Sequence, residues 1–105
     1  MSARNRRLVL TSEARSDLRD AVVFSEQRWG KSQRREYERS IASALDALAT
    51  FPHLGRSRPD YGRAFYSFPV RQHVIVYQVT ETDIIVVRLL HVRRDADSQF
   101  ETTAE

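Results

Sequence analysis

Two stretches in the first half of the chain place apolar residues three and four positions apart, the spacing of an amphipathic helix. The first begins after Thr11-Ser12-Glu13, which offers a helix N-cap and an acid for the first turn, and it stops at Gly30. A short apolar run at residues 6–10 precedes it and predicts a strand that leads into the helix. The predicted buried face of this helix consists of Ala14, Leu18, Ala21, Val22, Ser25 and Trp29.

The second helical stretch begins at Ser32, a residue suited to capping, and ends at Phe51-Pro52, because proline cannot continue a helix. Only Gly30-Lys31 separates the two predicted helices, so we expect an antiparallel hairpin. Residues 52–62 hold two of the three prolines and two of the three glycines, which predicts a loop. The apolar face of the second helix consists of Tyr37, Ile41, Ala44, Leu45 and Leu48.

Three later segments, residues 64–68, 73–79 and 84–90, are rich in the β-branched and aromatic residues typical of strands. The short links between them favour an antiparallel meander. The last two segments are apolar on both faces, so we expect them inside the sheet rather than at its edge. The predicted order is β-α-α-β-β-β, an α+β domain in which a helical hairpin packs on one face of a small, mainly antiparallel sheet.

The chain has 105 residues, the length of one domain, with an expected core at about residues 6–97 and a frayed polar tail at 98–105. It contains no cysteine, which removes disulfides and thiolate zinc sites. The sequence has no apolar run long enough for a membrane span or a signal peptide. We therefore expect a cytoplasmic protein without membrane contact.

The charges are 17 basic and 14 acidic residues, and Lys31 is the only lysine. Codon bias is the simplest reason for so much arginine, and the functional alternative is that guanidinium groups bind phosphate or carboxylate. A net charge of +3 is too small to coat nucleic acid, so we expect no direct sequence-specific nucleic-acid binding. The sequence also lacks a glycine-rich phosphate loop, an HExxH motif and a nucleophile elbow. This argues against metal enzymes and serine hydrolases, and we expect no metal and no cofactor.

Several cationic and imidazole side chains fall on or beside the last two predicted strands. Metal-free RNA cleavage needs a base, an acid and guanidinium groups around one phosphate. The candidates for these roles are Arg71, His73, Arg88, His91, Arg93 and Arg94, with Tyr77 as a third proton carrier. The three proton carriers also have ordinary structural interpretations: His73 is a partly exposed strand residue, His91 bonds to the backbone or to Asp95, and Tyr77 lies in the core.

Arg88 interrupts an apolar strand and is the hardest of these residues to explain structurally. Its side chain must either point to the sheet face away from the helices or lie buried beside a partner such as Asp95. In the first case, the residues that alternate onto an exposed apolar face with a cationic rim are Ile84, Val86, Arg88 and Leu90. Such a face favours a binding function, in which an acidic partner segment lies across the sheet.

The order of elements and several local strings resemble the ParE branch of the ParE/RelE toxins of bacterial type II toxin–antitoxin systems. The resemblance covers about residues 6 to 97. The matching strings are Leu8-Val9-Leu10-Thr11, Trp29-Gly30, Phe51-Pro52-His53-Leu54-Gly55-Arg56, Val76-Tyr77-Gln78-Val79 and Val87-Arg88-Leu89-Leu90-His91-Val92-Arg93-Arg94-Asp95.

This resemblance implies a toxin that a ParD-like antitoxin neutralises within a hetero-oligomer. ParE-like members act on DNA gyrase and trap its cleaved DNA complex, without being enzymes in the usual sense. The partner-binding residues expected on this interpretation are Arg71, Tyr77, Ile84, Val86, Arg88, Leu90, His91, Arg93 and Arg94.

The RelE-like members instead cut mRNA in the ribosomal A site. Against their pattern, Val74 stands where they carry an arginine and Phe100 where they carry a tyrosine, while Arg94 matches an arginine. This departure favours the gyrase-directed branch. The alternative, a ribosome-dependent endoribonuclease, would use Arg71, His73, His91, Arg93 and Arg94.

Overall fold

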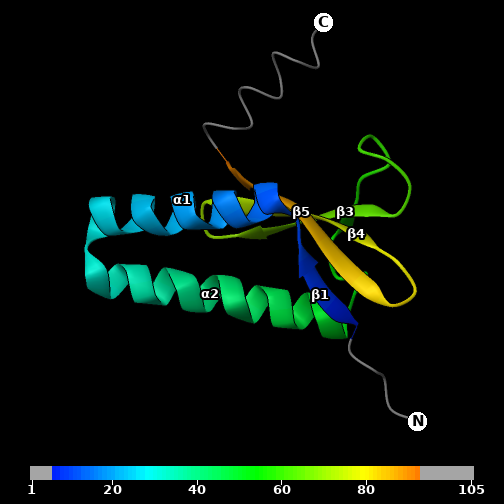
Figure 1. Cartoon of the computed structure of the whole chain (residues 1–105), viewed down its shortest axis with the longest axis horizontal. Coiled ribbons are helices and arrows are strands. Elements are labelled where there is room, and N and C mark those ends of the chain that lie inside the picture. The colour runs from blue at the N-terminus through cyan, green and yellow to red at the C-terminus, as the bar shows by residue number, and fades with distance from the viewer. Residues whose placement is uncertain (1–5, 93–105) are drawn as a thin grey trace, which may run out of the picture.

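Two long antiparallel helices lie against a five-stranded sheet in the computed structural model, which describes residues 6–92 (Figure 1). The helices extend beyond the sheet, so their connecting turn stands clear of the strands. In chain order the elements are β1 (Arg7–Leu10), α1 (Ser12–Trp29), α2 (Lys31–Thr50), β2 (Arg56–Ser57), β3 (Phe65–Val70), β4 (His73–Val79) and β5 (Asp83–His91).

The sheet has the order β1-β5-β4-β3-β2. Strands β3, β4 and β5 form the predicted antiparallel meander, while β1 pairs with β5 in parallel. The predicted α+β fold and the central position of β4 and β5 are confirmed. The structure adds the two-residue β2 inside the predicted loop, and it extends β3 to Val70, two residues further than expected.

Helix α1 begins as predicted, because the Thr11 hydroxyl accepts a hydrogen bond from the Ala14 amide at 3.1 Å. It ends at Gly30, whose φ of 92° suits a residue without a side chain. Helix α2 follows at once from Lys31, so Ser32 lies inside the helix and the predicted cap there is wrong. Trp29 was expected on the buried face, but it is 41% exposed because it sits at the hairpin turn, beyond the sheet.

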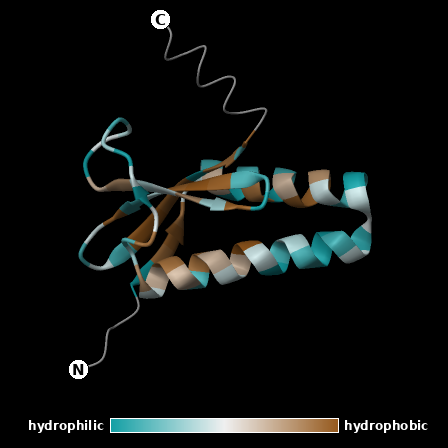
Figure 2. Cartoon of the chain, turned by 180° about the vertical axis from the view of Figure 1, so that it is seen from behind, coloured by the Kyte–Doolittle hydropathy of each residue, from teal (hydrophilic) through white to brown (hydrophobic). Residues whose placement is uncertain are grey.

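The core forms where the helices cover the sheet. Figure 2 shows the hydrophobic residues gathered in the strands and in the second half of α2, and hydrophilic ones in the first half of that helix. Alanines on the helices let them approach large side chains of the sheet closely. The largest fully buried side chains are Tyr77, Leu48, Ile75 and Ile84. Within residues 6–92, neither helix is long and apolar enough to cross a membrane.

A β-bulge in β5 changes the face on which its side chains lie. Val76 pairs with Arg88 and Tyr77 pairs with Val86, so Val87 has no partner in the register. Before the bulge along β5, Val86 faces the helices. After the bulge, Leu89 faces them. The alternation expected from the sequence is therefore shifted by one residue within this strand.

Loop residues 52–55 are fastened to the middle of the sheet by one hydroxyl group. The Tyr77 hydroxyl donates to the carbonyl of Pro52 at 2.8 Å and accepts from the amide of Gly55 at 3.0 Å. A Cβ atom on Gly55 would lie 2.6 Å from that hydroxyl and 2.7 Å from the Ser67 carbonyl oxygen. The loop therefore needs glycine at this position because the strands approach its backbone so closely.

Candidate functional site

The turn between β3 and β4 lies between the two helices and is tied to α2. Val70 pairs with His73, which leaves Arg71 and Gln72 as a two-residue hairpin loop. The Tyr37 hydroxyl of α2 accepts a hydrogen bond from the Gln72 amide at 3.3 Å, and Arg71 Nε donates to Ser40 Oγ at 2.9 Å. These two contacts hold the β3–β4 turn against α2.

Arg71 adopts a backbone conformation that is rare for a residue with a side chain. Its φ of 56° lies in the left-handed region, which glycine or asparagine usually occupies in a tight hairpin. Its guanidinium carbon lies 6.0 Å from the centre of the Tyr37 ring. Strained backbone of this kind is concentrated at functional sites, so the turn is a candidate for function.

A row of four rings crosses the molecule beneath this turn. His73 and His91 face each other across β4 and β5, with ring centres 5.1 Å apart and planes nearly perpendicular. His73 Nδ1 is hydrogen-bonded to the Tyr37 hydroxyl, and the His91 ring packs edge-on against Phe24 of α1. The row therefore links both helices through the sheet.

His73 and His91 are 2% and 7% exposed. The expectation of a partly exposed His73 is wrong, because α2 places Tyr37 over that ring. Burial also raises the pKa of Tyr37 above its ordinary value of 10.0, while the Gln72 amide and the positive charge of Arg71 act in the opposite direction. Tyr37 and His73 thus form an enclosed pair in which both groups serve to hold α2 on the sheet.

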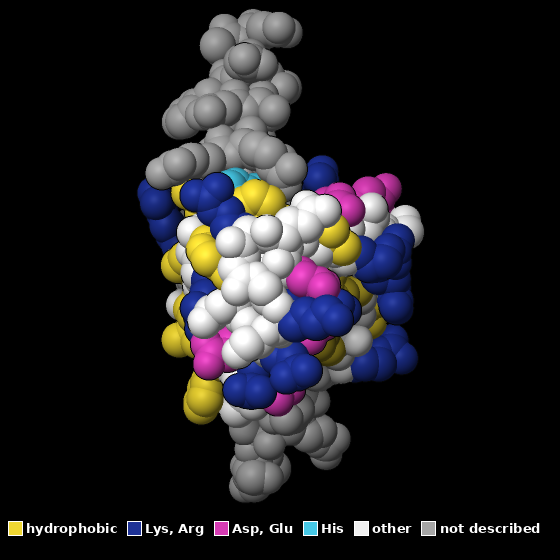
Figure 3. All heavy atoms as spheres, turned by 90° about the vertical axis from the view of Figure 1, so that its left-hand side faces the viewer, with side chains coloured by type: hydrophobic (Ala, Val, Ile, Leu, Met, Phe, Trp, Pro, Cys, Tyr) yellow, Lys and Arg dark blue, Asp and Glu magenta, His cyan; other side chains and the backbone are white. Residues whose placement is uncertain are grey.

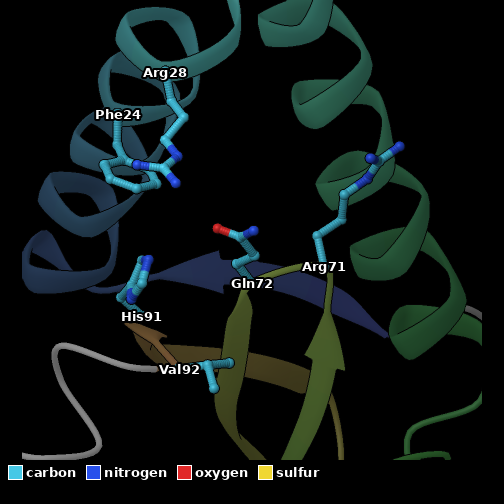
Figure 4. A pocket seen from close by; sticks show the side chains of 6 residues that line it. All are labelled: Phe24, Arg28, Arg71, Gln72, His91 and Val92. Atoms are coloured by element: carbon cyan, nitrogen blue, oxygen red, sulfur yellow. The ribbon is translucent and has the colours of Figure 1, made fainter.

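An open hollow of about 350 Å³ lies on the α1 side of the turn (Figure 4). We call it the turn hollow. The Val92 amide donates to the Gln72 carbonyl at 2.8 Å, which brings the end of β5 to its rim. Its lining residues are Phe24, Arg28, Arg71, Gln72, His91 and Val92. A smaller hollow of about 140 Å³ lies on the α2 side and shares Arg71 and Gln72 with it.

The two arginines of the turn hollow differ from several others in the chain. Arg7, Arg34, Arg58 and Arg88 each form an ion pair with a carboxylate. Within residues 6–92, neither Arg28 nor Arg71 has such a partner. Figure 3 looks onto the helix-hairpin end, where Lys and Arg side chains gather among scattered Asp and Glu. The lining of the turn hollow therefore combines these two arginines with the apolar side chains of Phe24 and Val92.

The structure brings only part of the predicted site together. Arg71, His73 and His91 meet around the turn, as the sequence suggested for a cluster on neighbouring strands. Tyr77 lies fully buried elsewhere on the sheet, where it holds the 52–55 loop. Arg93 and Arg94 lie outside the described residues, as do Asp95 and Phe100.

The predicted exposed face of β5 is wrong in two of its four residues. Ile84 and Val86 are 0% and 3% exposed, because the bulge at Val87 turns both toward the helices. Leu90 lies on the opposite face, beside Val74, and is half-buried. Arg88 does point outward, and its guanidinium binds Asp17 of α1, a partner that the sequence did not reveal.

Sequence reasoning missed Phe24, Arg28 and Gln72, which line the turn hollow. Phe24 and Arg28 stand four residues apart, so their position on one face of α1 was predictable from helical spacing. Nothing in the sequence indicated that these two residues lie near the β3–β4 turn, because that proximity depends on how α1 packs on the sheet. Among residues 6–92, the His, Cys, Asp and Glu side chains form no group of three that could hold a metal ion.

Comparison with known proteins places this chain in a family. The sequence model described as "ParE toxin of type II toxin-antitoxin system, parDE" matches residues 8–96. The chain belongs to the ParE toxin family. The resemblance noted from the sequence strings is thereby confirmed.

Individual ParE relatives match along nearly their whole length. Toxin ParE1 of Mycobacterium tuberculosis is 33% identical over 87% of this chain and 94% of its own. Toxin ParE1 of Caulobacter vibrioides is 29% identical, with 83% and 90% covered. A chain from the solved structure of the "Chromosomal ParDE TA system from P. aeruginosa" superposes with a TM-score of 0.71 at 17% identity, covering 84% of this chain and 97% of that one. The last comparison shows that the ParE fold is shared.

Two of the ParE-like strings prove to be parts of one structural unit. Phe51-Pro52-His53-Leu54-Gly55-Arg56 contains the loop, and Val76-Tyr77-Gln78-Val79 contains the tyrosine that fastens it. Their joint presence in this ParE-family chain follows from the contact, since either string alone would leave hydrogen-bonding groups without partners.

Proposed function

We propose that this chain is a toxin that inhibits DNA gyrase and is neutralised by a ParD-like antitoxin. Membership of the ParE family over residues 8–96 carries the proposal. Both the target and the antitoxin would be met in the cytoplasm, and a hetero-oligomer of toxin and antitoxin would be the inactive form. The structural neighbour comes from a ParDE system, which supports an antitoxin partner of the ParD kind.

The enclosure of His73 also supports inhibition by binding over ribosome-dependent RNA cleavage. A general base must come within hydrogen-bond reach of the proton that it removes. His73 is covered by Tyr37 and His91, so an RNA 2′-hydroxyl would have to displace packed rings to reach it. The exposed polar residues that line the turn hollow are Arg28, Arg71 and Gln72, a set suited to binding an anion.

The residues proposed for partner binding are those that reach the surface or a hollow. Arg71 and His91 line the turn hollow, and Arg88 and Leu90 lie on the outer face of the sheet. Ile84, Val86 and Tyr77 are enclosed in the core, so they would act on partner binding only through the fold. Arg93 and Arg94 stay in the proposal on the sequence resemblance alone.

A gyrase supercoiling assay beside primer extension on translated mRNA tests the proposed function. We expect the purified chain to block supercoiling of relaxed plasmid and to accumulate cleaved DNA, and we expect no cuts in mRNA. The chain premixed with its antitoxin is the control and should leave gyrase active. Cuts in the ribosomal A site without an effect on gyrase would replace this function by endoribonuclease activity.

A further inference from the structure

We infer that the turn hollow is an anion subsite that receives a side-chain carboxylate of the antitoxin, with an apolar group beside it. The inference rests on the proposed antitoxin partner and specifies where one of its acidic residues binds. The subsite consists of Arg28 on α1 and Arg71 on the β3–β4 turn, with Phe24 and Val92 as its apolar walls.

Figure 4 shows the two arginines at opposite sides of the hollow: the Arg28 side chain extends from α1 beside Phe24, and the Arg71 side chain extends from the turn toward α2. Arg71 is positioned by its Nε donation to Ser40, which occupies only one of its five N–H donors. Arg28 lies with its guanidinium carbon 5.9 Å from the centre of the Trp29 ring. Because neither has a carboxylate partner within residues 6–92, both can donate to an incoming anion without breaking an ion pair.

The backbone of the turn supports a binding role for the Arg71 side chain. A glycine would adopt a φ of 56° without strain, yet this chain has arginine there. In this conformation Arg71 lines both hollows, and its Nε donates to Ser40 of α2.

The walls of the hollow favour an acidic protein segment over nucleic acid. Phe24 is half-buried and Val92 is exposed, so an apolar group next to the carboxylate gains contact with both. A nucleic-acid strand would instead need a continuous basic stripe. The net charge of the chain is only +3, too small for such a stripe along its surface.

The test measures the affinity of the complete toxin for the antitoxin encoded beside it, by isothermal titration calorimetry. We expect Arg28→Gln and Arg71→Gly each to weaken binding about 10- to 100-fold, because each removes a charge-assisted hydrogen bond. Arg71→Gly separates binding from folding, since glycine suits the local φ and should leave thermal stability near that of the unaltered chain. Arg63→Gln, at an exposed arginine before β3, is the matched control and should bind normally.

A second arm identifies the occupant. Each acidic residue of the antitoxin is changed to its amide, and each variant is titrated against the unaltered toxin and against Arg28→Gln. We expect one carboxylate whose removal weakens binding to the unaltered toxin. The same removal should cause almost no further loss of affinity when the toxin already carries Arg28→Gln. The same toxin variants are titrated with a duplex DNA oligonucleotide, and we expect Arg28→Gln and Arg71→Gly to leave that weak binding within twofold.

The outcomes separate this inference from the proposed function. Equal antitoxin affinity for the unaltered chain, Arg28→Gln and Arg71→Gly would overturn the subsite and leave the toxin–antitoxin pair standing. Loss of DNA binding in these variants with antitoxin binding intact would assign the hollow to phosphate instead. Failure of the unaltered chain to bind the antitoxin would overturn both, whereas failure to inhibit gyrase with the subsite confirmed would overturn only the gyrase target.

Discussion

The carboxylate of Asp17 binds both the guanidinium of Arg88 and the backbone amide of Leu89. Its two oxygens lie 2.7 and 3.1 Å from the Arg88 nitrogens, and Oδ2 accepts from the Leu89 amide at 2.9 Å. Strand β1 pairs with β5 only as far as Val86, so the edge of β5 beyond that point needs another partner. Helix α1 supplies it, through Asp17 and through the Thr11 hydroxyl, which donates to the Val87 carbonyl at 2.8 Å.

We predict that Asp17→Ala destabilises the fold by about 1–3 kcal/mol, because the part-buried Leu89 amide loses its acceptor. Asp17→Asn keeps an acceptor oxygen and should cost clearly less. Arg88→Ala should cost about 1 kcal/mol or less, because the Arg88 side chain is 44% exposed and exposed ion pairs contribute little. Urea unfolding of the three variants measures these differences. An Arg88→Ala cost equal to that of Asp17→Ala would mean that the ion pair, rather than the amide contact, fastens α1 to β5.

The Tyr77 hydroxyl gives a second prediction. Tyr77→Phe leaves the Pro52 carbonyl and the Gly55 amide without their partner and should destabilise the fold by about 1–3 kcal/mol. Gly55→Ala should cost more, since its Cβ would meet a backbone oxygen at 2.7 Å as well as the hydroxyl. Thermal unfolding measures both. Gly62→Ala, at a second loop glycine with a positive φ and looser surroundings, is the comparison. An unchanged melting temperature for Tyr77→Phe would show that the loop is held elsewhere.

Ser25 is fully buried on α1, and its hydroxyl oxygen has no hydrogen-bond partner among residues 6–92. We predict that Ser25→Ala leaves stability unchanged or raises it by about 1 kcal/mol, because burying an unpaired hydroxyl is unfavourable and alanine favours the helix. Denaturant unfolding of this variant against the unaltered chain is the measurement. A loss of more than about 1 kcal/mol would show that the hydroxyl is paired in solution.

The ion pair between Arg7 and Asp83 predicts an acid dependence of stability. A hydrogen bond from Arg7, aided by its positive charge, lowers the pKa of Asp83 below its ordinary value of 3.8. Because the pKa is lower in the folded state, this pair adds stability at a pH above 3.8, and the contribution is lost as the pH falls through the folded value. We predict that Arg7→Gln raises the pKa of Asp83 in an NMR titration of its carboxyl carbon. Arg58→Gln should instead raise the pKa of Asp60 and leave Asp83 unchanged. An Asp83 that titrates identically in the Arg7 variant would contradict this assignment.

The elements that depend on neighbouring residues were predictable from the sequence. The apolar spacing of α1 and α2, the Thr11 cap, the glycine stop at Gly30 and the β-branched composition of β4 each act within a few residues. The ParE-like strings could be recognised for a related reason, because close backbone approach and hydrogen bonding restrict positions such as Gly55 to one residue type. The cluster of Arg71, His73 and His91 also followed from their places on adjoining strands.

The tertiary structure decided the features that depend on how those elements meet. The bulge at Val87 arises in the pairing of β4 with β5, and it moved Ile84 and Val86 into the core. The Asp17 partner of Arg88 lies 71 residues away in sequence, and Phe24 and Arg28 reach the turn only because α1 crosses the end of β5. The sequence thus determined which residues form helices and strands, since hydrogen bonding and side-chain periodicity within an element are local. Packing between distant elements determined which of the cations face an open hollow, because that depends on strand register and on the path of the helices.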